Sequence, residues 1–176
     1  MVGIAHEVIP ADIDESYLPG EVPLAHAERL AREKAASVSA RHREAIVIGA
    51  DTIVVIDNMV LGKPRDRDDA ARMLSLLSGR THTVFTAVAV QRGGCIESGV
   101  EAVTVTFRHL SPADIDAYLA TEEPMDKAGA YGIQGYGATI VERIDGDFFA
   151  VMGLPLGRMV RLMERLGLRY DFTGVA

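Results

Sequence analysis

Residues 46–56 read Ile-Val-Ile-Gly-Ala-Asp-Thr-Ile-Val-Val-Ile, and this stretch decides the fold. Its apolar, β-branched composition predicts a strand that is buried on both faces of a sheet. Asp57-Asn58 follows as a turn signal, so Met59-Val60-Leu61 is expected to return as a short partner strand. We therefore expect a sheet built around one long central strand.

Helical and strand patterns interleave on both sides of this strand. They predict a strand at 7–9, helices over 23–41 and from Asp66, a hairpin of strands 82–91 and 101–109, a helix from Ser111-Pro112, a strand at 138–144 and a last helix over 155–166. Such interleaving indicates an α/β fold, in which a mixed β-sheet is flanked by helices.

Length and charge bound the class of protein. The chain has 176 residues, which is close to the usual length of one domain, so we expect a single domain over residues 1–176. Its net charge of −7 argues against a broad nucleic-acid-binding surface, although a local basic pocket for a small anion is compatible with it. One cysteine, Cys95, fits a reducing compartment, and no apolar run approaches the ~20 residues of a membrane span. We expect a cytoplasmic protein with neither nucleic acid nor membrane as partner.

Asp51 is the most informative polar position. Burying a carboxylate within an apolar strand is costly unless the group is paired or bound to a metal. Asp51 could mark a functional site or could cap neighbouring backbone at a bulge, and we favour the functional reading. Further carboxylates that could act with it are Asp12, Asp14 and Glu15.

The basic candidates for binding phosphate are Lys34, Lys63, Arg80 and Lys127. Pro64 fixes the chain after Lys63, while Arg80 could grip a phosphate or cap helix carbonyls. His82 is interpreted as structural. The glycine-dense segment 126–137 permits close approach to a ligand but lacks P-loop and dinucleotide-binding patterns. Acidic and basic sets together suit metal-assisted attack of water on a polyphosphate.

Several motifs, in order along the chain, resemble the Maf family of nucleotide pyrophosphatases. They are Asp14-Glu15-Ser16, Arg32-Glu33-Lys34-Ala35, Gly49-Ala50-Asp51-Thr52, Gly62-Lys63-Pro64, Leu77-Ser78-Gly79-Arg80-Thr81-His82, Asp126-Lys127-Ala128-Gly129-Ala130-Tyr131-Gly132-Ile133-Gln134-Gly135 and Gly153-Leu154-Pro155. The resemblance implies a fold like that of the inosine-triphosphatase group, with an elongated, curved mixed sheet and helices around a central cleft. It also implies a homodimer that uses Mg²⁺ or Mn²⁺ to hydrolyse nucleoside triphosphates to monophosphate and pyrophosphate.

The same resemblance implies roles for single residues. Asp51 matches the proton acceptor for the attacking water, and Thr52 and Gln134 match positions tied to base choice in the branch that prefers dTTP and UTP. Metal binding falls to Glu15 and Asp51. The positions that match phosphate contacts are Lys34 and Lys63 and, more loosely, Arg80 and Lys127.

Two departures from the family pattern stand out. The family normally opens with a strand and a Ser-x-Arg-Arg segment that holds the triphosphate, whereas this chain starts with Met1-Val2-Gly3-Ile4. Either the start was assigned too far downstream or the protein lacks this strand and phosphate clamp, and we favour an upstream start. Glu122 stands where the family often has Gly.

Two alternatives to a pyrimidine nucleotide pyrophosphatase stay open at this point. One is a non-catalytic protein that binds nucleotide or a cell-division partner. The other is a related pyrophosphatase that removes modified nucleotides.

Overall fold

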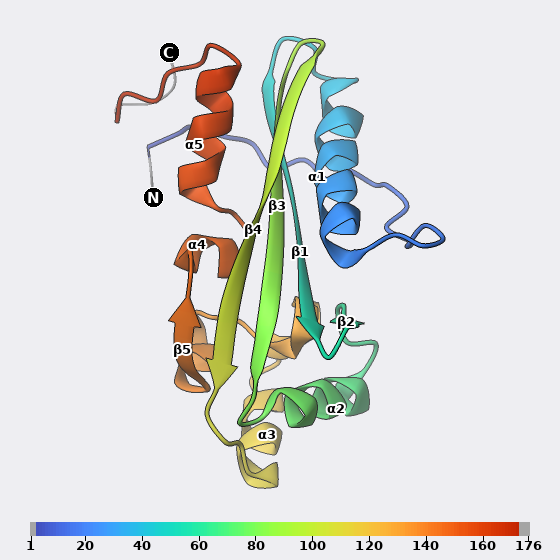
Figure 1. Ribbon diagram of the computed structural model, residues 1–176, viewed down its shortest axis with the longest axis vertical. Coiled ribbons are helices and arrows are strands. Elements are labelled where there is room, and N and C mark those ends of the chain that lie inside the picture. The colour runs from blue at the N-terminus through green and yellow to red at the C-terminus, as the bar shows by residue number, and fades with distance from the viewer. Residues whose placement is uncertain (1–2, 173–176) are drawn as a thin grey trace. The chain divides into compact units, whose positions relative to one another are not determined.

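The computed structural model describes residues 3–172 (Figure 1). Its helices and strands are α1 (Pro23–Ser39), β1 (Ile46–Ile56), β2 (Met59–Leu61), α2 (Arg67–Leu77), β3 (Thr81–Arg92), β4 (Cys95–Phe107), α3 (Pro112–Leu119), β5 (Val141–Asp145), α4 (Phe148–Val151) and α5 (Leu156–Arg165). The strands form one sheet in the order β2-β1-β3-β4-β5, and the β1–β2 and β4–β5 ladders are antiparallel. The predicted α/β fold, a sheet flanked by helices, is confirmed.

Helix starts lie where local capping signals predicted them. The Asp66 side chain accepts a hydrogen bond from the backbone N–H of Asp69 at the start of α2. At the start of α3, Ser111 and Asp114 form a reciprocal capping box. Such caps satisfy backbone N–H groups that have no partner inside the helix, and this is why they locate helix ends from sequence alone.

Three predicted strand positions were wrong, and one of them is the strand expected at 101–109, which runs from Cys95 to Phe107. Residues 7–9 lie in an irregular segment that is held by side chains of the helix region: Ser37 Oγ donates to the carbonyl of Ala11, and Arg41 donates to that of Pro10. The strand expected at 138–144 begins only at Val141, because Gly135–Thr139 forms a 3₁₀-helix. In the segment that contains residues 7–9, side chains supply the hydrogen bonds to backbone carbonyls. At 138–140, a short 3₁₀-helix and its C-terminal residue take the place of the expected strand.

Burial along β1 differs from the prediction of a strand covered on both faces. Val47 is buried, whereas Ile46 and Ile48 are 38% and 37% exposed. This alternation is typical of a strand covered on one face. Two successive residues, which point to opposite faces of the sheet, are both buried only further along the strand, at Ile53 and Val54.

Contacts divide the chain into two compact units. Unit 1 comprises the residues up to Asp51, Thr86–Glu101 and the residues from Gly153 onward, and unit 2 comprises Thr52–Phe85 and Ala102–Met152. The strands β1, β3 and β4 contribute residues to both units. That residues 1–176 form a single domain stays a prediction.

Each unit has an apolar core of its own. In unit 1, α5 packs Met159, Leu162 and Met163 against Val88 and Val90 of β3. Unit 2 holds the larger core, which is built from β-strand residues and from α2 and α3 and includes the fully buried Phe107. Among the described residues, no helix has the length and apolar character needed to cross a membrane.

The backbones of α1 and β1 approach each other closely at Gly49. A Cβ at this position would overlap the carbonyl oxygen of Ala31 and would lie 2.7 Å from the backbone nitrogen of Ala35. Glycine is therefore required here by packing. The approach matters for the site, because α1 carries Lys34 and β1 carries Asp51.

Gly49→Ala is expected to destabilise the protein by about 1–3 kcal/mol, since overpacking forces the helix away from the strand. Gly94→Ala is the matched control, because a Cβ there meets nothing within 4 Å and its change in unfolding free energy is expected to stay within about 0.5 kcal/mol. Urea unfolding measures both variants. Equal stability of the two variants would contradict the packing argument.

Glu122 adopts a left-handed conformation with φ 60° and ψ −4°. This conformation destabilises the folded state by about 1–2 kcal/mol for a residue with a Cβ. Glycine avoids that strain, but its greater conformational entropy stabilises the unfolded state by roughly 0.4–1 kcal/mol. Glu122→Gly is thus expected to be more stable than Glu122→Ala, which keeps the Cβ. A higher melting temperature for the alanine variant would show that the strain argument fails.

Candidate active site

Three of the candidate residues meet in one ion-pair network in unit 1. The Nζ atom of Lys34 lies 2.7 Å from Asp51 Oδ1 and 2.7 Å from Glu15 Oε1. The Asp51 side chain is 10% exposed, while that of Glu15 is 54% exposed. The carboxylate in the apolar strand therefore has a counter-ion, as its burial requires.

Lys34 is a fixed cation. Partial burial lowers the pKa of its ammonium group, but the hydrogen bonds to Asp51 and Glu15 outweigh this effect, so the pKa is raised. Lys34 consequently stays charged at neutral pH and cannot serve as a base. It is suited to orienting Asp51 or to binding an anion.

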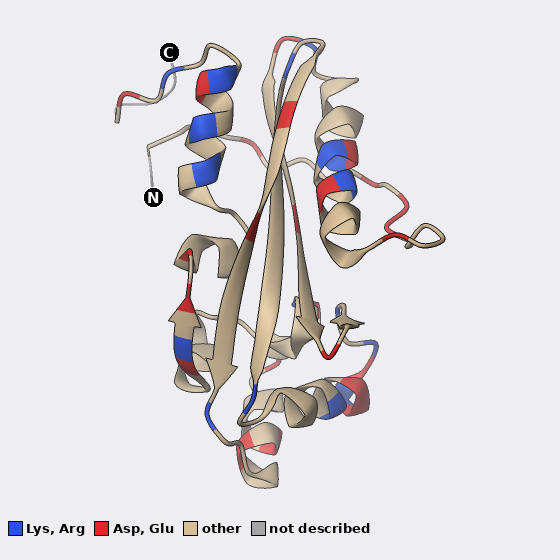
Figure 2. Cartoon of the chain, in the orientation of Figure 1, with Lys and Arg blue, Asp and Glu red and all other residues tan. Residues whose placement is uncertain are grey.

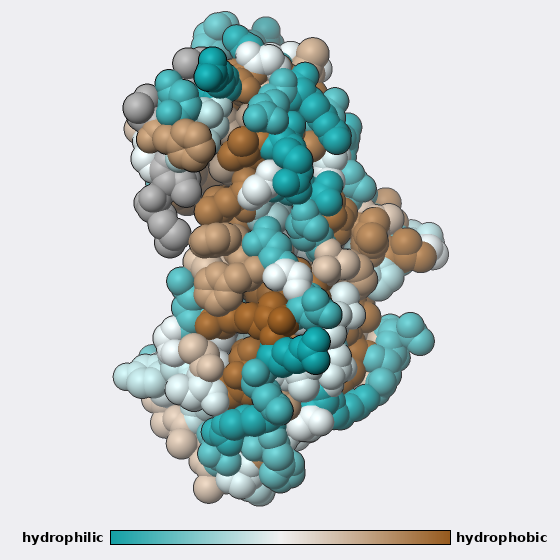
Figure 3. Space-filling model, turned by 60° about the vertical axis from the view of Figure 1, so that its left-hand side comes forward, coloured by the Kyte–Doolittle hydropathy of each residue, from teal (hydrophilic) through white to brown (hydrophobic). Residues whose placement is uncertain are grey.

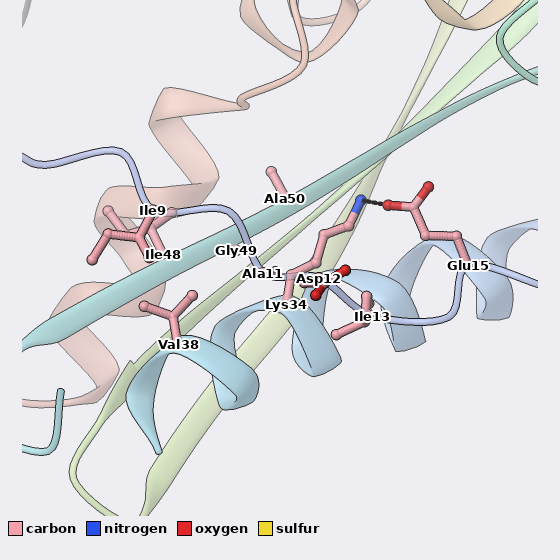
Figure 4. A pocket seen from close by; sticks show the side chains of 10 residues that line it. All are labelled: Ile9, Ala11, Asp12, Ile13, Glu15, Lys34, Val38, Ile48, Gly49 and Ala50. Atoms are coloured by element: carbon pink, nitrogen blue, oxygen red, sulfur yellow. Dashed lines mark ion pairs between the residues drawn. The ribbon is translucent and has the colours of Figure 1, made fainter. Parts of the chain in front are cut away.

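A pocket of about 440 Å³ opens beside this network. It is lined by Ile9, Ala11, Asp12, Ile13, Glu15, Lys34, Val38, Ile48, Gly49 and Ala50. Figure 4 shows the amino group of Lys34 directed toward Glu15, whereas Ile9, Ile48 and Val38 gather at the other end. A cavity of this size with an apolar end and a few convergent charges is typical of a small-molecule site.

The donors in this network fit a metal that is shared with a substrate. Among residues 3–172, no group of three or more His, Cys, Asp or Glu side chains is placed to hold a metal ion. Asp51 and Glu15 nevertheless direct oxygens at one cation, the ammonium of Lys34. Mg²⁺ is commonly held by one or two carboxylates together with substrate phosphates, so this pair suits such an ion.

Unit 2 holds the remaining basic candidates and the specificity candidates. Lys63 follows β2 and is exposed, and the backbone N–H of Gly129 donates to the carbonyl of Gly62 at 3.0 Å. Lys127 donates to Asp126 and to the carbonyl of Glu123. The Lys63 turn and the glycine-dense segment are thus joined directly.

The two specificity candidates, Thr52 and Gln134, also belong to unit 2. Thr52 is half-buried within β1. Gln134 is exposed and lies at the N-terminal end of the 3₁₀-helix Gly135–Thr139.

Arg80 and His82 have structural partners. Arg80 donates to Asp57 at 2.6 Å and to the carbonyl of Leu76 near the end of α2. This second bond agrees with the interpretation of Arg80 as a residue that caps helix carbonyls. His82 is buried, with its Nε2 2.7 Å from the hydroxyl of Tyr131. Burial lowers the pKa of His82 to about 4, so the ring is neutral near pH 7. The burial and the contact with Tyr131 agree with the structural interpretation of His82.

Figure 2 shows mixed charges on α1 and a row of basic positions on α5. Those on α5 contact acidic residues of β4: Arg158 and Arg161 bind Glu101, and Arg165 approaches Glu97. These ion pairs link α5 to β4, and the Lys34 network involves other elements.

The whole sequence was compared with those of known protein families. The family model described as "Maf-like protein" matches residues 1–166. This chain belongs to the Maf family. The resemblance seen in its motifs is thereby confirmed.

Relatives within the Maf family are similar over nearly the whole chain. The dTTP/UTP pyrophosphatase of Syntrophomonas wolfei is 51% identical over 168 residues, covering 94% of this chain and 89% of that protein. The enzyme of the same name from Aquifex aeolicus is 48% identical over 168 residues, covering 96% and 88%. That of Symbiobacterium thermophilum is 49% identical over 175 residues, covering 99% and 90%.

One organising residue of this Maf protein escaped the sequence analysis. The carboxylate of Glu123 accepts hydrogen bonds from the hydroxyl of Tyr118 and from the backbone N–H groups of Tyr136 and Gly137. The available signal was a carboxylate a few residues before a glycine-dense segment, whose backbone N–H groups need acceptors. From the sequence alone, those glycines were expected to allow close approach of the backbone to a ligand.

The Lys34–Asp51 pair is expected to show a coupling energy of about 1–3 kcal/mol in a double-mutant cycle of Lys34→Met and Asp51→Asn, because both charges are largely withdrawn from water. Glu15→Gln serves as the control. The exposed Glu15 should contribute no more than about 1 kcal/mol. Denaturant unfolding of the four proteins in the cycle gives the coupling energy, and a value near zero would contradict the role given to the pair.

Proposed function

We propose that this Maf protein hydrolyses dTTP and UTP to nucleoside monophosphate and pyrophosphate. The observation that carries the proposal is the largely buried Asp51, which is held by Lys34 beside a pocket of nucleotide-binding size. Relatives about half identical in sequence and named dTTP/UTP pyrophosphatases support the same activity.

Unit 1 would supply the hydrolytic groups. Asp51 accepts the proton of the attacking water, and Lys34 fixes the carboxylate in place and offsets charge on the phosphates. Asp51 and Glu15 would hold the divalent metal, for which we propose Mg²⁺ or Mn²⁺. When bound, such an ion polarises phosphoryl oxygens and stabilises their developing charge.

Further residues are proposed to recognise the nucleotide. Lys63 and Lys127 are proposed as phosphate contacts, and Arg80 would need to leave Asp57 to join them. Thr52 and Gln134 are proposed to select the base. The amide of Gln134 offers one donor group and one acceptor, which matches the edge of a pyrimidine.

Asp51→Asn is expected to lower kcat by about 10²–10⁴-fold, because the amide has the shape of the carboxylate but cannot take the proton. Pyrophosphate release from dTTP, with and without metal, measures the effect. Asp116→Asn, a change at an exposed carboxylate on α3, is the control and should keep the wild-type rate. A wild-type protein that binds dTTP without releasing pyrophosphate would support the non-catalytic alternative instead.

Gln134→Ala is expected to reduce the preference for UTP and dTTP over GTP by roughly 5- to 150-fold, because a base-reading amide contributes only to the matching base. The ratio of kcat/KM values for these nucleotides measures the preference. An equal loss for all bases would indicate a structural role for Gln134.

A homodimer is proposed for the assembly. The surface in Figure 3 carries hydrophobic side chains, and the exposed apolar residues of unit 2 include Phe148, Phe149 and Tyr136. Exposed aromatic side chains are often enriched where subunits meet. Light scattering of the purified protein tests the proposal, and a monomeric mass at micromolar concentration would overturn it.

The cytoplasm is the proposed location. Its support is the single exposed thiol of Cys95, which suits a reducing compartment. Fractionation of cells that produce the protein tests this proposal.

A further inference from the structure

Three glycines of the segment 126–137 close around one carboxylate. A Cβ at Gly135 would overlap Glu123 Oε2, a Cβ at Gly137 would lie 3.0 Å from Oε1, and one at Gly132 would lie 3.2 Å from Oε1. Gly135 also has a φ of +62°. The glycines therefore permit close approach of the backbone to Glu123, a group within the chain itself.

The carboxylate of Glu123 fixes the backbone after Gln134. Its Oε2 accepts from the N–H of Tyr136 at 2.9 Å, and its Oε1 accepts from the N–H of Gly137 at 3.0 Å. These two bonds lie two and three residues beyond Gln134, at the start of the 3₁₀-helix that Gln134 precedes.

The backbone before Gln134 is tied to the same carboxylate through a tyrosine. The N–H of Gly132 donates to the hydroxyl of Tyr118 at 3.1 Å, and that hydroxyl donates to Glu123 Oε1 at 2.8 Å. Gln134 is thus the middle of a short arch whose two ends are held by one anion. Its own side chain stays exposed.

Glu123 is ionised in this arrangement. Desolvation raises the pKa of its carboxyl group, but the hydrogen bonds from Tyr118, Gly137 and Tyr136 outweigh this effect, and the net pKa is lowered. An ionised carboxylate is only an acceptor, so it can satisfy three donors at once, whereas an amide cannot do so at both of its ends. Because both oxygens of Glu123 accept these hydrogen bonds, the carboxylate holds the backbone of the arch in place.

We propose that Glu123 is a positioning residue, which sets the nucleotide base preference by holding the arch that presents Gln134. This inference rests on the proposed function. It assigns no contact between Glu123 and substrate, so the residue affects base choice only through Gln134.

The test compares Glu123→Gln with Tyr118→Phe and Gln134→Ala. Glu123→Gln keeps the size of the side chain but turns an NH₂ group toward backbone donors. Tyr118→Phe removes the hydroxyl that links Gly132 to Glu123, and with it one of the three hydrogen bonds that Glu123 accepts. We expect Glu123→Gln to reduce the UTP-over-GTP ratio of kcat/KM by roughly tenfold or more, with a smaller reduction for Tyr118→Phe. In a Gln134→Ala background, Glu123→Gln should cause no further loss of preference.

A role in folding alone would give a different pattern. It would lower the melting temperature and reduce the rates for UTP and GTP by the same factor, which would overturn the inference. Should Glu123→Gln fail to fold, Tyr118→Phe carries the same comparison, because it leaves the Glu123 carboxylate and its bonds to Tyr136 and Gly137 in place. Preference equal to wild type in Tyr118→Phe would then count against the arch.

Failure of the inference can be told from failure of the proposed function. Calorimetric binding of α,β-imido analogues of UTP and GTP measures base preference without turnover. A wild-type protein with no preference would overturn the base-selecting role proposed for Gln134 and this inference together, whereas a wild-type protein that releases no pyrophosphate from dTTP or UTP would overturn the proposed function. Loss of preference in Gln134→Ala, with full preference kept in Glu123→Gln, would overturn this inference alone.

Discussion

The packing of α1 on β1 at Gly49 is the constraint on which the site in unit 1 depends. Only a residue without a Cβ allows the helix backbone at Ala31 and Ala35 to come so near the strand. Lys34 lies between those two alanines and Asp51 lies two residues after Gly49, so the same approach brings the ammonium to the carboxylate at 2.7 Å. The ion pair is therefore a product of backbone packing.

The pair explains how a carboxylate can lie in an apolar strand. An unpaired charge in this place would oppose folding, whereas here the ammonium of Lys34 offsets the charge of the carboxylate. Lys34 also contacts the more exposed Glu15, so one cation holds two oxygens that suit a divalent ion with a phosphate substrate. In unit 2 the relation is reversed, because a single anion, Glu123, gathers backbone donors around itself.

The parts of the fold that the sequence predicted are those with local causes. The central strand, the caps at Asp66 and Ser111 and the glycine turn between β3 and β4 depend on neighbouring residues, and each lies where its pattern indicated. The segment that contains residues 7–9 could not be placed, because the carbonyls of Pro10 and Ala11 that follow are bonded by the side chains of Arg41 and Ser37, more than twenty residues away in the chain. Side-chain anchoring of this kind leaves no periodic signal.

In the candidate site, single residues could be chosen from the sequence, but their partners could not. Asp51 stood out because its polarity conflicts with its surroundings, but its partnership with Lys34 depends on how α1 docks. Arg80 was chosen for its charge, and its bond to Asp57 depends on the turn between β1 and β2. Glu123 was missed because the glycines that enclose it permit close approach equally well to a ligand or to the chain itself.

Phosphorus NMR of dTTP incubated with the protein and Mg²⁺ tests the central claim, which is hydrolysis between the α- and β-phosphates. We expect the three triphosphate signals to be replaced by those of thymidine monophosphate and pyrophosphate. Unchanged dTTP, or the signals of thymidine diphosphate and inorganic phosphate, would contradict it.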